Sequence, residues 1–230
     1  NAALAKIEAF NNGDGKTPAP LDLSDYEAAG VTGVTAGNLA AVNAQVLAQA
    51  IGGADSQPEV QALVTAANAA LAKIEAYNNG NGTTPAALTL ADYEAAGITG
   101  VTANNVAAVN AQVLKQDTSG ADTVGEVQAL VTAADQALAK IENYNNGNGT
   151  TPAALTLADY TNAGVSGVTA GIVDTVNALV LAQTSGGADS QPEVQTLVNM
   201  LIQAVNAIVQ AAQGDTAVSG SLPLATFTAA

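Results

Sequence analysis

Carboxylates are the side chains of this chain with the most scope for chemistry. Its 230 residues include 20 Asp and Glu but no Cys, no His and only five basic residues, all of them Lys. Without imidazole or thiol groups, acid–base catalysis would depend on two carboxylates held close together. The spacing of the acidic residues gives no such pair, so we expect no enzymatic activity and no catalytic residues.

Nine of the 20 carboxylates stand where a helix would begin. Ser56 is followed three residues later by Glu59, the capping-box spacing in which a hydroxyl and a carboxylate each bond a free backbone N–H. The same capping role, fully sufficient to explain each residue, is predicted for Asp25, Asp92, Asp159, Glu59, Glu126 and Glu193. A second set precedes the long helices and adds negative charge near their N-termini: Asp55, Asp122 and Asp189.

One segment rich in Asn and Gly, Asn11–Gly15, invites comparison with a calcium loop. If Gly15 took the sixth position of an EF-hand, Phe10 and Leu21 would be its first and last ligands, and neither can bind a cation. Zinc is excluded because its usual Cys and His ligands do not occur. We therefore expect no cofactor-binding and no metal-binding residues. A looser calcium site using Asp22, Asp25 and loop carbonyls stays open as the alternative.

Aromatic residues recur at fixed positions. They are expected to fill a small core, with the tyrosine hydroxyls reaching solvent, and stacking on a ligand is the alternative. The two recurring sets are Tyr26, Tyr93 and Tyr160, and Phe10, Tyr77 and Tyr144.

The whole chain is built on one repeat. The words LAKIEAF, LAKIEAY and LAKIENY begin at Leu4, Leu71 and Leu138, so the two intervals between them are equal. The words on either side recur at the same interval, and residues 1–10 match residues 68–77. The chain therefore begins inside a repeat, as a slice of a tandem array would.

Each period predicts a long helix of about 20 residues. It starts after Ser56, Thr123 or Ser190, with Pro58 and Pro192 in the first turn, where a missing N–H costs nothing. Lys73 and Lys140 fall near its C-terminal end, where a cation suits the helix dipole. Its apolar stripe is Val60, Leu63, Val64, Ala67, Leu71 and Ile74.

Two further helices are predicted in each period. The short one follows Thr89 or Thr156 and stops at Gly97 or Gly164. The medium one starts after an N-capping Thr, either Thr35, Thr102 or Thr169. Its predicted buried stripe is Val106, Val109, Val113 and Leu114.

The predicted fold is all-α, an extended tandem array of three-helix units with one long, one short and one medium helix per repeat. Segments such as NNGNGTTPAA read as linkers. The expected divisions are the end of a preceding repeat and its linker at 1–21, repeats at 22–80, 81–147 and 148–215, and a tail at 216–230. The last repeat has a divergent final helix, and the tail starts another domain or a more divergent repeat. Beads on a string and a continuous solenoid both remain open.

Charge and hydropathy limit the partners. A net charge of -15 with five scattered lysines argues against nucleic acid. The most apolar segment, residues 198–212, is broken by Asn and Gln, so no membrane insertion is expected. The partners left are a host or surface protein and neighbouring repeats of the same chain.

The word DYEAAGITGVTANNVAAVNAQV, after NGTTPAALTLA, resembles repeats of very large secreted bacterial surface proteins that act as adhesins. The resemblance covers nearly all of residues 4–215. It implies an extracellular, cell-surface location and a non-enzymatic structural or adhesive role, as a spacer or attachment module. The segment AAGITGVTANN is also similar to a turn of albumin-binding three-helix modules, which makes protein-ligand binding the alternative.

The capping assignment predicts the effect of a single substitution. Glu126→Ala should lower the free energy of unfolding by about 0.5–2 kcal/mol, the range for loss of a helix cap. Thermal unfolding of the two proteins measures the difference. An unchanged melting temperature would mean that the helix begins elsewhere.

Overall fold

The fold is all-helical over the part of the chain that the structure describes, as predicted. This computed structural model describes residues 2–13, 19–80, 86–147 and 153–212, so most of each linker and the tail from residue 213 lie outside the described residues. The predicted domain boundaries stay predictions. Within the described ranges the helices are α1 (Ala2–Asn12), α2 (Leu23–Ala28), α3 (Leu39–Leu47), α4 (Gln57–Asn79), α5 (Leu90–Ala95), α6 (Val106–Val113), α7 (Val124–Asn146), α8 (Leu157–Asn162), α9 (Val173–Leu181) and α10 (Gln191–Ala212).

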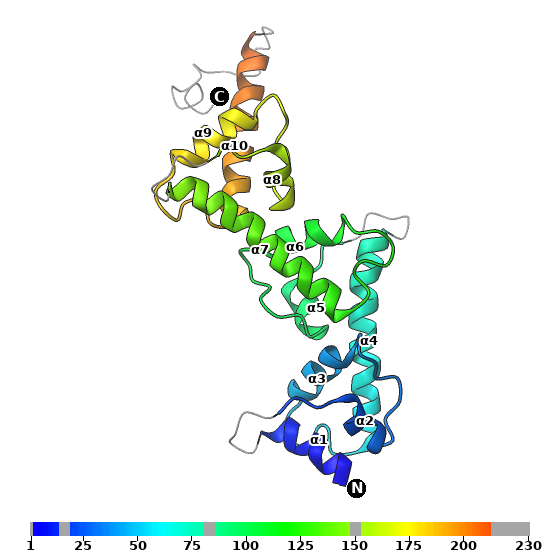
Figure 1. Ribbon diagram of the computed structural model, residues 1–230. Coiled ribbons are helices and arrows are strands. Elements are labelled where there is room, and N and C mark those ends of the chain that lie inside the picture. Colours follow the sequence, from blue (N-terminus) through cyan, green and yellow to red (C-terminus); the bar gives the residue numbers. More distant parts are fainter. Residues whose placement is uncertain (1, 14–18, 81–85, 148–152, 213–230) are drawn as a thin grey trace. The chain divides into compact units, whose positions relative to one another are not determined.

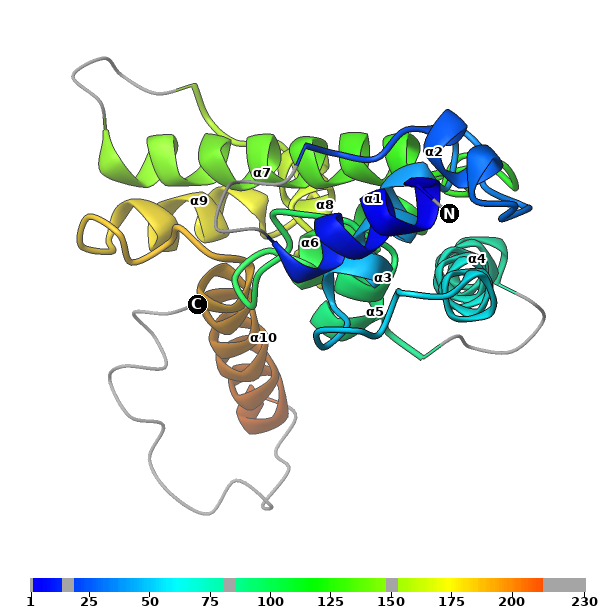
Figure 2. The same ribbon diagram turned by 90° about the horizontal axis from the view of Figure 1, so that it is seen from below.

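The chain divides into two compact units. One comprises residues 1–106 with 113–131, and the other comprises residues 107–112 with 132–230. In the first unit α1 packs against α2 and α3, and α4 packs against both α3 and α5 (Figures 1 and 2). In the second unit α9 packs against α10.

The long helices begin as the sequence predicts, but α4 runs on through Asn78 and Asn79, which the sequence predicts to lie in the linker. The Glu59 carboxylate accepts hydrogen bonds from the backbone N–H and the hydroxyl of Ser56, at 3.1 and 2.8 Å. Pro58 lies in the first turn of α4, and Gly80 ends the helix in the left-handed conformation. All six residues of the predicted apolar stripe are buried.

The predicted start of the medium helix is wrong. The N-cap of α3 is Asn38 instead of Thr35, and its side chain makes no capping bond. The Asn38 amide oxygen instead accepts from the backbone N–H of Thr35 at 2.7 Å, so residues 35–38 form a turn ahead of the helix. The predicted stripe is also wrong at both ends, because Leu114 is 49% exposed and Val106 is only half-buried, while Val109 and Val113 are fully buried.

The short helices end at glycines that let two helices come close. Gly97 follows α5 with a φ of 71°, and a Cβ built on it would lie 2.7 Å from the carbonyl oxygen of Ala40 in α3. Gly164 repeats this arrangement against Ala107 and Ala108 in the second unit. Two separate constraints therefore require glycine at this position. One is the left-handed backbone conformation, and the other is the close approach of the neighbouring helix.

One described helix is long and apolar enough to cross a membrane by length and composition alone. This segment, Gln191–Ala211, lies within α10. The core helix of a soluble protein meets the same criteria, so the absence of membrane insertion stays a prediction.

The glycine contact predicts a difference between two equivalent substitutions. Gly97→Ala should lower the free energy of unfolding by more than about 2 kcal/mol, because left-handed strain and a backbone clash add together. Gly30 is the matched control, since it has a φ of 75° and open space around its Cα. Gly30→Ala should show the strain alone, about 1–2 kcal/mol. Urea unfolding measures both, and equal losses would contradict the close approach of α5 to α3.

Candidate functional site: the lysine–aspartate cap and its pocket

One aspartate in each period joins two helices. Asp159 is the third residue of α8, and its Oδ2 accepts hydrogen bonds from the backbone N–H and the hydroxyl of Thr156, both at 2.8 Å. Its Oδ1 lies 2.5 Å from the Lys140 Nζ of α7. The same ion pair forms at Lys6–Asp25 and Lys73–Asp92, also at 2.5 Å.

These ion pairs correct two predictions. Capping alone does not explain the aspartates, since each also binds a lysine across the linker segment. The predicted interaction of Lys73 and Lys140 with the helix dipole is also wrong, because neither lysine lies in the last turn of its helix, α4 or α7. Their partner is a carboxylate on the following short helix.

The electrostatics of the site favour the charged aspartate. Burial works to raise the pKa of Asp159, but the hydrogen bonds from Lys140 and Thr156 outweigh it and hold that pKa below its usual range. The pKa of Asp92 is lowered in the same way. A carboxyl with a depressed folded-state pKa adds stability above its unfolded pKa of about 3.9 and loses it as the pH falls through the folded value.

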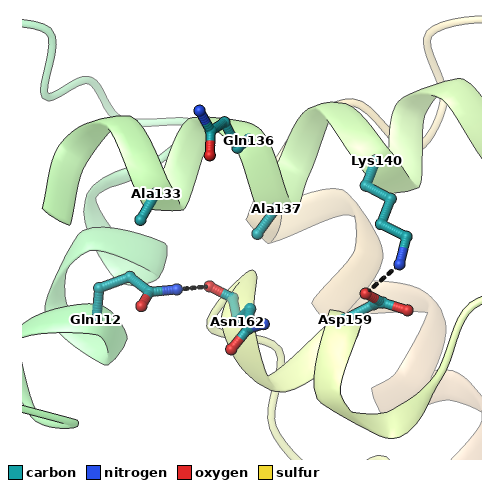
Figure 3. Close-up of a pocket in the computed structure, with 7 residues that line it drawn as sticks. All are labelled: Gln112, Ala133, Gln136, Ala137, Lys140, Asp159 and Asn162. Atoms are coloured by element: carbon teal, nitrogen blue, oxygen red, sulfur yellow. Dashed lines mark hydrogen bonds and ion pairs between the residues drawn. The ribbon is translucent and has the colours of Figure 1, made fainter. Parts of the chain in front are cut away.

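A shallow pocket lies beside this ion pair in the second unit. Its volume is about 290 Å³, and α7 supplies one wall with two alanines and Gln136 (Figure 3). On the facing side the Gln112 Nε2 donates to the carbonyl oxygen of Asn162 at 2.5 Å, and Lys140 reaches Asp159. The lining offers amide, carboxylate and ammonium groups for hydrogen bonds, and its ammonium group is paired with Asp159.

Carboxylates do lie next to each other at the starts of the long helices, and the expectation that no pair suits acid–base catalysis stays a prediction. Asp55 lies within hydrogen-bonding reach of Glu59, and that contact raises the pKa of Asp55. The pKa of Glu59 is lowered, first by the Ser56 hydroxyl and then by Asp55. Equivalent pairs form at Asp122–Glu126 and Asp189–Glu193. Each pair belongs to a helix cap, and the capping hydroxyl explains why the glutamate is the member whose pKa is lowered.

A hollow of about 410 Å³ in the first unit brings two more carboxylates near one another. Glu75 of α4 and Asp122, just before α7, both contribute to its lining. Within the described residues no three Asp or Glu side chains come close enough to hold a metal ion. In the looser calcium site left open as the alternative, Asp22 caps α2 and Asp25 binds Lys6, while loop residues 14–18, whose carbonyls would complete it, lie outside the described residues, so it stays a prediction.

The recurring tyrosines point into the core. Three of them are fully buried: Tyr26, Tyr93 and Tyr160. The prediction that their hydroxyls reach solvent is therefore wrong. The Tyr160 hydroxyl donates to the Asn177 amide oxygen at 2.6 Å, and the Asn177 amide donates to the Leu155 carbonyl at 2.9 Å. Burial raises the pKa of Tyr160 well above its usual value. The second set, Phe10, Tyr77 and Tyr144, is also buried.

Sequence reasoning missed the role of the Asn pair that ends α1, α4 and α7. Asn11 belongs to α1, and its amide donates to the carbonyls of Val46 and Gln49 at the end of α3, at 2.9 and 3.1 Å. Asn12 accepts from the backbone N–H of Gly52 at 3.2 Å. Asn145 and Asn146 repeat this arrangement on α9. These side chains therefore bind backbone groups at and just beyond the end of the medium helix, and the recurrence of the Asn pair at residues 11–12, 78–79 and 145–146 was the available signal.

The comparisons with known proteins give no relative. No family model, no curated protein and no solved structure matches this chain.

The dual role of Asp159 predicts unequal losses at the two ends of its ion pair. Asp159→Ala should cost about 0.5–2 kcal/mol, because it removes the cap as well as the pair. Lys140→Met keeps the cap and should cost less than about 1 kcal/mol, the usual value of an exposed ion pair. Urea unfolding at pH 7 gives both losses, which should shrink as the pH falls and protonates Asp159 in the parent protein. Equal losses at pH 7 would show that the cap contributes nothing.

Proposed function

We propose that this chain is a non-enzymatic tandem array, a spacer or attachment region of a bacterial extracellular surface protein. The observation that supports a structural role most directly is that the same bonds recur in every period. An active site has no need of three copies on one chain, whereas an array needs each copy to make the same contacts.

The recurring bonds extend beyond the ion pair. The Gln61 amide oxygen accepts from the backbone N–H of Thr32 at 3.0 Å, and its amide nitrogen donates to the Thr32 carbonyl at 2.9 Å. Gln128 binds Thr99 in the same way, as Gln195 binds Ser166. Each of these glutamines lies in the first half of a long helix and binds the turn that precedes the medium helix.

Within the first unit the long helix α4 serves two successive periods. Its first half binds Thr32 through Gln61 and packs on α3, while its second half binds Asp92 through Lys73 and packs on α5. Gln45 of α3 also donates to the Ala95 carbonyl of α5 at 2.7 Å. These contacts between periods favour a continuous array over independent beads, and they supply the neighbouring repeats that we propose as partners.

Location and attachment rest on the sequence. An acidic, Cys-free, repetitive chain suits export and a long life outside the cell, and the resemblance to secreted surface repeats implies the same location. A spacer projects another domain and needs no ligand of its own.

Protein-ligand binding, as in albumin-binding modules, is the second candidate, and one observation favours it. Leu47, Leu114 and Leu181 occupy the same position in successive periods, and each is 47–49% exposed. A binding module would present a matching apolar side chain on every copy. Saturable binding of serum albumin, lost in a variant that still folds and carries Ser in place of Leu47, Leu114 and Leu181, would support this candidate over the spacer.

The extended array predicted from the equal periods should have a larger radius of gyration in solution than a compact chain of the same length. A compact chain of this length has a radius of gyration of about 17 Å, whereas three units in line, each about 30 Å long, give roughly 25–30 Å. Small-angle X-ray scattering in physiological salt distinguishes the two. A variant lengthened by one more period should increase the maximum dimension by about 30 Å. A radius of gyration at the compact value would contradict the spacer.

A further inference from the structure

The second half of α10 carries apolar side chains that the described residues leave partly uncovered. Val205 and Ile208 occupy the positions that Leu71 and Ile74 hold in α4, two periods earlier. Leu71 and Ile74 are buried in α4, which packs against α5. Val205 and Ile208 are only half-buried, and the neighbouring Val209 is 45% exposed. Figures 1 and 2 show this half of α10 extending past α8 and α9.

The sequence after α10 keeps the register of the repeat. Residues 214–230, which lie outside the described residues, align without a gap with residues 80–96. The alignment places Gly214 at Gly80, Leu222 at Leu88 and Phe227 at Tyr93. Leu88 and Tyr93 are among the most deeply buried side chains of the first unit. Apolar residues therefore stand at the two positions by which the equivalent segment enters the core.

The ion pair of the earlier periods is lost at both ends together. Ala207 stands at the position of Lys73, and Thr226 stands at the position of its partner Asp92. Asp92 is the largely buried member of that pair, so an aspartate at position 226 without a lysine at 207 would lose the charge that offsets its burial. Loss of both charged residues together is expected if positions 207 and 226 face each other, as Lys73 and Asp92 do.

We propose that residues 214–230 dock on the second half of α10, with Leu222 and Phe227 covering Val205 and Ile208. The occupant is part of the same chain and follows the helix almost directly, so its effective concentration exceeds that of a separate molecule. The contact is apolar, with the ion pair of the earlier periods absent. This inference is independent of the proposed function, since docking can occur in a spacer and in a binding module alike.

Hydrogen exchange of the full 230-residue chain tests the docking. Phe227→Glu should speed amide exchange in residues 202–211 by about tenfold or more, because burial of a Phe side chain is lost. The matched control is Thr228→Glu, at the position of the exposed Glu94, and it should leave that exchange unchanged. Exchange in residues 124–146 reports whether both variants remain folded. Equal exchange of residues 202–211 in the two variants would overturn the proposal.

Two other occupants of this face are outcomes of the same experiment. Protection of residues 202–211 that disappears on dilution would place a second copy of the chain there. Protection that requires vesicles of phosphatidylcholine and phosphatidylglycerol would place a bilayer there. Either result overturns docking of residues 214–230.

A grafted ion pair tests the register. Ala207→Lys combined with Thr226→Asp should slow exchange of residues 202–211 by about twofold or more beyond the product of the single changes, as an exposed pair does. Ala207→Lys with Thr228→Asp is the mismatched control and should show no coupling. Coupling that is absent in the first pair, or equal in both pairs, would overturn the proposed register.

Discussion

One carboxylate per period carries out two tasks on which the rest of the packing depends. A helix of six residues, such as α8, is too short to be stable by itself. Asp159 stabilises its first turn with one oxygen and attaches it to α7 through Lys140 with the other. Tyr160 is the next residue and the one aromatic residue of α8. Fixing Asp159 therefore also directs the Tyr160 ring into the core, where it is fully buried. The cap thus determines both the position and the rotation of the short helix.

The core that this arrangement encloses is built from small side chains. Alanines such as Ala41, Ala67 and Ala108 are fully buried, and glycines at the ends of the short helices let backbones approach closely. Such a core removes little apolar surface from water per residue, so the apolar contribution to stability is modest. Side chain–backbone hydrogen bonds therefore specify the packing, as Gln45 does on Ala95 and Asn145 on Val180.

The sequence predicted much of what depends on residues within four positions of each other, apart from the turn from Thr35 to Asn38, and it missed what depends on packing. The capping boxes at Ser56 and Thr156 and the apolar stripe of α4 follow from local spacing, and all are confirmed. The Lys140–Asp159 pair joins residues 19 apart across a linker, and local spacing says nothing about it. Leu114 fits the helical period of α6, but it lies beyond the last helical residue and faces outward. Asn11 looked like part of a linker because its partners lie in another helix, far along the chain.

The distribution of charge connects this packing to an array. Three of the five lysines donate to the capping aspartates, so most of the positive charge is used within the fold. The remaining carboxylates outnumber the remaining lysines heavily, and the repeat spaces them evenly along the chain. Like charges on neighbouring molecules repel over about 8–10 Å at physiological salt, which opposes self-association of a chain with exposed leucines. The lysines that order each period internally thereby leave the surface of every period acidic.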